Sequence, residues 1–345
     1  MTRFNTLLEK AFEETYNADE MPSKADYVSK YKAMKDWLDR NCYRFIGSAT
    51  SAEDGSFFTD HGPEHFEEVI KYAGMLLGIS SDNAKCELTS YEVFLLLSAI
   101  LLHDAGNVFS RHGHEKKPMT ILNEMGMVAI ETPVERKIIA DIAASHGGKV
   151  NGGDKDTINA RIKHRESNFV SISYRPRLVA AIVRFADEIC ENQTRTSSFL
   201  TNVTDLPKTS QVFHLYATSI SSCTVDLRSR RVNVHYSLYE KDVKTKFGKL
   251  DSDCYLIDEI FDRVEKMYQE LMYCSKFFSG LIAVDGIRAR ITVYDEEHEE
   301  IDELTIDSEE GYPSAKLDLR KKHPSWVGEN LNKRICQIEG ASNGG

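Results

Sequence analysis

The sequence predicts a mainly α fold, with an all-helical core followed by a smaller α+β C-terminal region. Apolar residues recur at helical spacing through most of the first 200 residues, between capping residues and glycines. From about residue 205 the pattern alternates and is rich in Val, Thr, Ser and Tyr, which is typical of strands. We therefore expect N-terminal helices over residues 1–54 that pack on the core, the core domain over 55–204, an α+β domain over 205–335 and a flexible tail over 336–345.

The composition is that of a globular protein. The 345 residues, 41% of them hydrophobic and 28% charged, suffice for two cores or for one large domain with an appendage. A formal net charge of -11 weighs against a surface that coats duplex DNA or an anionic membrane, although a local basic pocket could still hold a phosphate. Seven cysteines without a CxxC pair predict free thiols. The longest apolar run, Val93 to Leu102, is too short to span a bilayer, so we expect a cytoplasmic location.

The chain is expected to begin with helices that scaffold the core. Residues 4–17 and roughly 24–41 carry apolar residues at helical spacing. The next helix has Pro63 in its first turn and closes at Gly78, because proline suits a helix start and glycine a helix end.

The most apolar helix is expected over Tyr91–Gly106, with Thr89 or Ser90 as its cap. It ends with an imidazole beside a carboxylate, at His103 and Asp104. Burying a lone carboxylate is costly unless something pairs with it. This ending therefore indicates a bound cation, and a metal is the simplest one.

Two polar segments and two helices complete this outline of the predicted core. Asn107–Pro118 is a polar turn dense with metal-ligand side chains. A capping box that starts at Thr132 opens a helix that runs to His146. Residues 148–170 are polar and predict a long loop, and Pro176–Cys190 is a mostly apolar helix that carries Asp187.

The C-terminal region mixes strands and helix. Gln211–Tyr239 alternates and predicts two or three strands. Asp253–Phe278 returns to helical spacing. Leu281–Tyr294 is expected to form a strand, an Asp-Gly turn and a second strand, and the acidic run Asp295–Glu300 a solvated hairpin tip.

The helix ends present a series of potential metal ligands. In chain order these are His61, His65, His103, Asp104, His112 or His114, His146 and Asp187. Histidine and carboxylate together suit borderline or hard cations. We expect a divalent metal site, for Mn, Mg, Fe or Zn, held by His65, His103, Asp104 and Asp187, and the sequence leaves open whether one or two ions bind.

This order of residues resembles the HD-domain phosphohydrolase superfamily, over roughly residues 55–200. The motif residues are His65, the pair His103-Asp104 after an apolar helix, and Asp187 on a later apolar helix. Asn107 departs from the pattern, since many members carry lysine there. The resemblance implies an all-helical core with one or two metals that hydrolyses phosphoesters or nucleoside triphosphates. It is nearest to deoxynucleoside triphosphate triphosphohydrolases and to HD proteins of antiphage systems that deplete nucleotides.

Three further histidines are candidate catalytic residues. His114 and His146 could bind a second metal, act as general acid or contact the departing phosphate, and the alternative is a polar cap. His61 could orient a water or touch substrate, or it could cap the loop before its helix.

Several cationic side chains are candidates for phosphate contacts. Lys116, Lys117 and Arg184 are assigned to substrate, the alternatives being a solvated cluster for the lysines and a brace on Asp187 for the arginine. The group Arg228, Arg230 and Arg231 could bind a regulatory nucleotide between subunits, or it could be a solvated turn. The first option rests on the resemblance, because related triphosphohydrolases are commonly oligomers switched by nucleotides.

We thus predict a cytoplasmic, homo-oligomeric phosphohydrolase that acts on nucleotides, with deoxynucleoside triphosphates ahead, in antiviral nucleotide depletion. The alternatives are a nucleotide-sensing module that binds without hydrolysis, and a phosphodiesterase or nuclease that acts on cyclic or single-stranded nucleotides. Neither a membrane nor duplex DNA is an expected partner.

Overall fold

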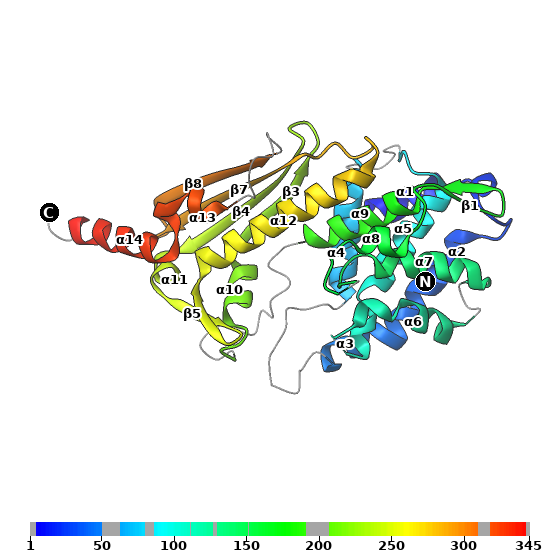
Figure 1. The fold of residues 1–345 in the computed structure, drawn as a ribbon, viewed down its shortest axis with the longest axis horizontal. Helices are drawn as coiled ribbons and strands as arrows, with labels where there is room; N and C mark the ends of the chain where they lie inside the picture. The colour runs from blue at the N-terminus through cyan, green and yellow to red at the C-terminus, as the bar shows by residue number, and fades with distance from the viewer. Residues whose placement is uncertain are drawn as a thin grey trace. The chain divides into compact units, whose positions relative to one another are not determined.

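The computed structural model describes residues 5–49, 63–79, 86–110, 112–126, 130–150, 152–190, 207–309 and 318–342. The protein is mainly α, with a part that contains β-sheet (Figure 1). It divides into two compact units. Unit 1 takes in the described residues up to Cys190 together with Tyr273–Ala283, and unit 2 takes in those of Glu191–Met272 and Val284–Gly345.

Unit 1 is built from helices and one small hairpin. Its helices are α1 (Leu7–Glu14), α2 (Tyr27–Leu38), α3 (Arg44–Ala49), α4 (Pro63–Leu76), α5 (Ser90–His103), α6 (Pro118–Met125), α7 (Pro133–Ala144), α8 (Thr157–Arg161) and α9 (Pro176–Glu188). Short helical turns lie at η1 (Ala18–Glu20), η3 (Ala105–Val108) and η4 (His114–Lys116). The hairpin pairs β1 (Ser167–Phe169) with β2 (Ile172–Tyr174).

Helix α5 is the centre of unit 1. Every one of its residues is buried, and it contacts α2, α4, α7 and α9. Thr89 and Glu92 form a capping box at its start. The same Glu92 carboxylate accepts hydrogen bonds from Nε and Nη2 of Arg175, each at 2.7 Å, at the start of α9. This two-pronged charged contact fixes the two apolar helices that end at the candidate site.

The window Ser90–Val108 has the length and the mean hydropathy, 1.2, of a membrane span. However, 94% of that window is buried inside the protein, as in the core helix of a globular domain.

Unit 2 is an α+β arrangement around a four-stranded sheet of order β3-β4-β7-β8 (Figure 1). The strands are β3 (Ile220–Asp226), β4 (Arg231–Tyr239), β7 (Gly286–Tyr294) and β8 (Glu300–Glu309). A second pair joins β5 (Lys246–Lys249) to β6 (Ser252–Tyr255). The helices are α10 (Gln211–Ser219), α11 (Glu240–Lys244), α12 (Leu256–Phe278), α13 (Leu319–Lys322) and α14 (Gly328–Ser342), and α12 continues into residues of unit 1 from Tyr273 on.

Two strands, β3 and β4, form within Gln211–Tyr239 as predicted, but two other strand predictions were wrong. Gln211–Ser219 is a helix, because Val212, Leu215, Tyr216 and Ser219 are buried at helical spacing. The Asp-Gly pair at 285 and 286 is not a hairpin turn. Asp285 instead accepts a hydrogen bond from Nε of Arg230 at 2.7 Å, and β7 then begins parallel to β4.

Other boundaries also differ from expectation. The polar segment 148–170 contains α8 and β1 rather than one long loop. Helix α14 continues to Ser342, where the sequence predicted a tail from residue 336. The acidic run after Tyr294 does connect β7 to its antiparallel partner β8, as expected of a hairpin tip.

Candidate metal centre

Six histidine and aspartate side chains gather where helices of unit 1 begin or end. His65 lies in the first turn of α4, His103 ends α5 and Asp104 follows it, His114 opens η4, His146 follows α7, and Asp187 lies in the last turn of α9. The C-terminal end of a helix carries partial negative charge. Placing the carboxylates of Asp104 and Asp187 there is unfavourable by itself, so the position favours a nearby cation.

The side chains form two groups of three, each with ligand atoms within 4.8 Å of one another. In the first group, Oδ1 of Asp187 lies 3.3 Å from Nε2 of His65 and 3.5 Å from Nε2 of His103. We call these three residues cluster A.

The second group, cluster B, consists of Asp104, His114 and His146. Oδ1 of Asp104 lies 2.9 Å from Nε2 of His114 and 3.5 Å from Nε2 of His146. The other oxygen, Oδ2, lies 3.8 Å from Nε2 of both His65 and His103. Asp104 therefore faces both clusters, one oxygen toward each.

The orientation of two imidazoles is fixed by the backbone. Nδ1 of His103 is 2.7 Å from the carbonyl oxygen of Ile100, and Nδ1 of His146 is 2.7 Å from that of Ala143. A carbonyl can only accept, so Nδ1 carries the hydrogen in each ring. The neutral ring then keeps its lone pair on Nε2, the nitrogen that faces the carboxylates, as is usual for a metal-ligating histidine.

The residues present fit a divalent cation. Nε2 of His103 is buried, and no residue in the described part of the chain forms a hydrogen bond with it. Burial lowers the pKa of this ring, but the carboxylates of Asp104 and Asp187 outweigh it and raise the pKa to about 9. Burial raises the pKa of Asp187, but pairing with His103 and His65 outweighs it and holds the pKa well below its usual range. The pocket thus stabilises positive charge, and its donor set suits Zn, Fe, Mn or Mg.

A glycine allows cluster B to form. A Cβ on Gly106 would lie 2.3 Å from the carbonyl oxygen of His114, so only glycine lets η4 come this close to η3. Gly148 similarly leaves room for Glu115, whose side chain a Cβ there would meet at 2.7 Å.

The other predicted catalytic and substrate residues fall in different places. His61 lies outside the described residues. His112 and Lys116 are exposed, and Nζ of Lys117 lies 5.8 Å from the ring centre of Phe109. Arg184 is buried, and its Nη1 donates to the Lys155 carbonyl at 3.0 Å and to Oγ1 of Thr157 at 2.7 Å. A phosphate contact of Arg184 stays a prediction.

Two of the three predicted regulatory arginines are paired with carboxylates. Arg228 and Arg230 belong to the turn between β3 and β4, and Arg231 begins β4. Arg230 is paired with Asp285 at 2.7 Å, and Arg231 with Asp307 at 2.7 Å. These two guanidinium groups face carboxylates of the same unit, and binding of a regulatory nucleotide stays a prediction.

Sequence reasoning missed two residues at the centre. Sγ of Cys190 is buried and lies 3.7 Å from Nδ1 of His65, the ring nitrogen that faces away from Asp187. Glu115 is buried with Oε2 3.9 Å from Nδ1 of His114. Cys190 had a usable signal, since it follows Asp187 by about one helical turn. Glu115 had none, because a polar turn does not reveal which side chain points inward.

The comparisons with known proteins give one match. A family model described as HD-CE matches residues 56–266, which is more than half of the chain. No curated protein and no solved structure matches the chain.

Proposed function

The chain belongs to the HD-CE family, and from this premise we propose that it is a metal-dependent phosphohydrolase that acts on nucleotides, with deoxynucleoside triphosphates as the first candidates. Family membership and the two His/Asp clusters suggest a metal-dependent HD hydrolase. One observation carries the proposal. The two oxygens of Asp104 face two separate clusters, so this carboxylate can serve two ions at once.

The residues that would hold the ions follow from the geometry. Cluster A supplies two imidazoles and one carboxylate, and cluster B the same set, with Asp104 in reach of both. Divalent ions bound there would polarise a phosphoryl oxygen and lower the pKa of a water. The backbone carbonyls of Ile100 and Ala143 hold the rings of His103 and His146 in the orientation that binding requires, which avoids reorganisation when substrate arrives.

The geometry favours metal binding over acid catalysis for two of the predicted catalytic residues. His114 and His146 share Oδ1 of Asp104, and the side chain of His146 is only 5% exposed. A general acid must reach the leaving group. We therefore assign His146 to cluster B from its burial, and His114 from its 2.9 Å contact with Oδ1 of Asp104.

A nucleotide substrate is supported by the segment that carries His114. Lys116 is exposed, and the Phe109 side chain is 53% exposed close to Nζ of Lys117. Lysines can neutralise phosphates, and an exposed aromatic ring can stack on a base. Two lysines near one exposed ring suit a nucleotide better than an uncharged ester.

The test is a substrate panel. Purified protein is incubated with deoxynucleoside triphosphates, ribonucleoside triphosphates, cyclic dinucleotides and single-stranded oligonucleotides, with Mn²⁺ or Mg²⁺ and with chelator. We expect phosphate or triphosphate release from deoxynucleoside triphosphates that chelator and Asp104→Asn abolish. The control Asp36→Asn, which removes an exposed carboxylate of α2, should retain activity.

Two results would redirect the proposal. If no compound is turned over with any divalent metal, yet calorimetry shows that a nucleotide binds, the protein is a sensor rather than an enzyme. If only cyclic or single-stranded substrates are cleaved, it is a phosphodiesterase or nuclease.

A further inference from the structure

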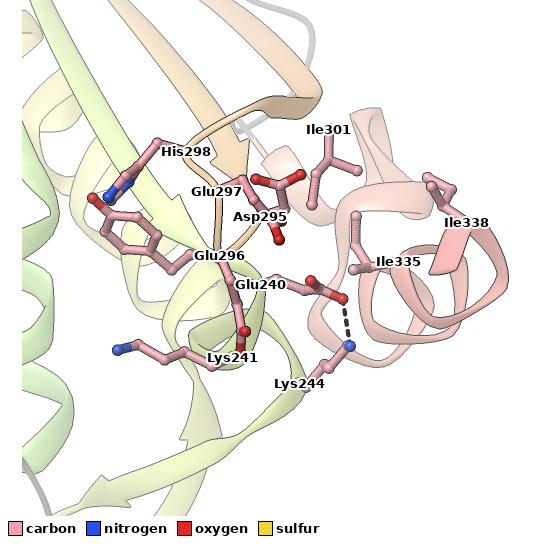
Figure 2. A pocket seen from close by; sticks show the side chains of 11 residues that line it. Glu240, Lys241, Lys244, Asp295, Glu296, Glu297, His298, Ile301, Ile335 and Ile338 are labelled. Carbon is pink, nitrogen blue, oxygen red and sulfur yellow. Dashed lines mark hydrogen bonds and ion pairs between the residues drawn. The ribbon is translucent and has the colours of Figure 1, made fainter. Parts of the chain in front are cut away.

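Unit 2 contains a pocket of about 820 Å³ that shares no residue with the two clusters. It lies among the tip of the β7–β8 hairpin, helix α11 with the preceding Tyr239, and helix α14 (Figure 2). A pocket of this size accommodates a few side chains or a small ligand.

One part of the lining is apolar. Figure 2 groups Ile301, Ile335 and Ile338 on one side of the pocket. Ile338 is 40% exposed and Tyr239 is 36% exposed, and they belong to the few large apolar side chains that the described residues leave open to solvent. Exposed apolar side chains that share a pocket mark an interaction site better than scattered ones do.

The other part of the lining is acidic, and three of its four carboxylates have no ion-pair partner within the described ranges. Glu240 is ion-paired with Lys244 (Figure 2). Asp295, Glu296 and Glu297 form no ion pair with any residue in the described ranges, and Lys241 is the remaining cation of the lining.

Several other carboxylates in or next to the same sheet face arginines. The pairs are Asp285 with Arg230, Asp307 with Arg231 and Arg288, Glu303 with Arg290, and Asp302 with Arg334. The hairpin tip therefore presents three carboxylates that lack ion-pair partners within the described ranges, beside an apolar wall.

The tip is also well ordered by local hydrogen bonds. Oδ1 of Asp295 accepts from the backbone N–H of Glu299 at 2.8 Å, and the backbone N–H of His298 donates to the carbonyl of Asp295 at 3.3 Å. His298 adopts a φ of 66°, and its ring lies edge-on to Tyr239 with centres 5.5 Å apart. Because the turn is preformed, less conformational entropy is lost when a partner binds it.

From these features we infer that the pocket docks a lysine- or arginine-rich amphipathic segment of a partner protein. The pocket carboxylates repel a phosphate-bearing ligand because both carry negative charge. A purely apolar ligand would desolvate the carboxylates without forming hydrogen bonds or ion pairs in return. Lysine and arginine combine an apolar stem, which can cover Ile338, with a cationic head that can reach Glu296 and Glu297. Arginine can also stack on the exposed ring of Tyr239.

The experiment measures binding of a defined probe to the full-length protein. The probe is a fluorescein-labelled peptide with arginine and lysine on one helical face and leucine on the other, and its counterpart has glutamate at each basic position. Glu296→Gln/Glu297→Gln removes two pocket carboxylates. Glu299→Gln/Glu300→Gln is the matched control, because it removes the same charge from the same hairpin outside the pocket lining.

We expect saturable binding of the basic peptide that weakens as salt increases. Two exposed ion pairs are lost in the first variant, so its affinity should fall about 2- to 30-fold, and that of the control variant should change less than about twofold. Ile338→Ser should also weaken binding, since it removes part of the apolar wall.

Four outcomes would overturn the inference: no saturable binding, equal binding of the acidic peptide, an equal loss in the control variant, or self-association that Ile338→Ser abolishes in sedimentation. The last would identify a second copy of the chain as the occupant. None of these outcomes depends on metal or on hydrolysis, so the test is independent of the proposed function.

Discussion

Replacing Gly106 by alanine tests whether cluster B depends on the close approach of η3 and η4. The new Cβ would lie 2.3 Å from the carbonyl oxygen of His114 and 2.9 Å from Cβ of Lys117. Side-chain carbons essentially never come within 3.0 Å of such an atom, so the backbone at His114 must retreat by at least 0.7 Å, the difference between 2.3 and 3.0 Å.

The displacement falls on the shortest contact of cluster B. Nε2 of His114 is 2.9 Å from Oδ1 of Asp104. Forcing an extra methyl into a packed site costs about 1–3 kcal/mol. When a reacting group is displaced by about 1 Å, the rate of the catalysed reaction falls about 100-fold. Cluster A takes its ligands from α4, α5 and α9, so it should persist. We therefore expect Gly106→Ala to keep one metal site, to lose or greatly weaken the second, and to hydrolyse its substrate about 100-fold more slowly.

The assay is titration of metal-free protein with Mn²⁺ by calorimetry, followed by metal analysis. Gly147→Ala is the matched control, because Gly147 adjoins His146 but a Cβ there meets nothing within 4 Å, and its backbone is outside the left-handed region. Cluster B does not depend on Gly106 if Gly106→Ala binds both ions with wild-type affinity, or if Gly147→Ala loses the second site equally.

Three further predictions concern the ligands and their support. Asp104→Asn should weaken both metal sites, because one oxygen faces each cluster; metal analysis that still finds two tightly bound ions would contradict this. The two carboxylates raise the pKa of His103 to about 9 despite its burial, so the metal-free ring is protonated below pH 9 and metal must displace that proton. Affinity should therefore fall as the pH is lowered from 9, and calorimetry in buffers of different ionisation enthalpy should detect proton release near neutral pH; binding without release would refute it. Cys190→Ala should reduce metal affinity about tenfold, the usual effect of removing a partner of a ligating ring, because Sγ contacts Nδ1 of His65; an unchanged titration would show that the thiol only fills space.

The helices that carry the ligands could be predicted because their signals are local. Pro63, Thr89, Thr132 and Pro176 each lie at or next to the first residue of a helix in the structure, in the roles expected of capping residues and N-terminal prolines. The candidate ligands follow from these helices because they lie at or near the ends.

What could not be predicted depends on contacts between distant segments. In the parallel pairing of β4 with β7, Val232 lies opposite Ile287. Parallel strands are not joined by a tight turn, so no turn residue in the sequence predicts this pairing. The buried contacts of Arg184 involve Lys155 and Thr157 in a segment that the sequence assigned to a loop. In α10 the alternation and the helical spacing coexist, and only burial in the folded unit decides between them.

The division into two clusters also explains how so acidic a protein could bind an anionic substrate. With a single ion shared by four ligands, the carboxylates of Asp104 and Asp187 would cancel the charge of a divalent cation and leave nothing to attract a phosphate. Two divalent ions, one in each cluster, would together carry twice as much positive charge as the carboxylates of Asp104 and Asp187 carry negative charge, so a net positive charge would remain. The attraction for phosphate would then come from the bound ions rather than from a basic surface, which a net charge of -11 does not favour. On this argument a variant that keeps only cluster A should lose affinity for the nucleotide as well as rate.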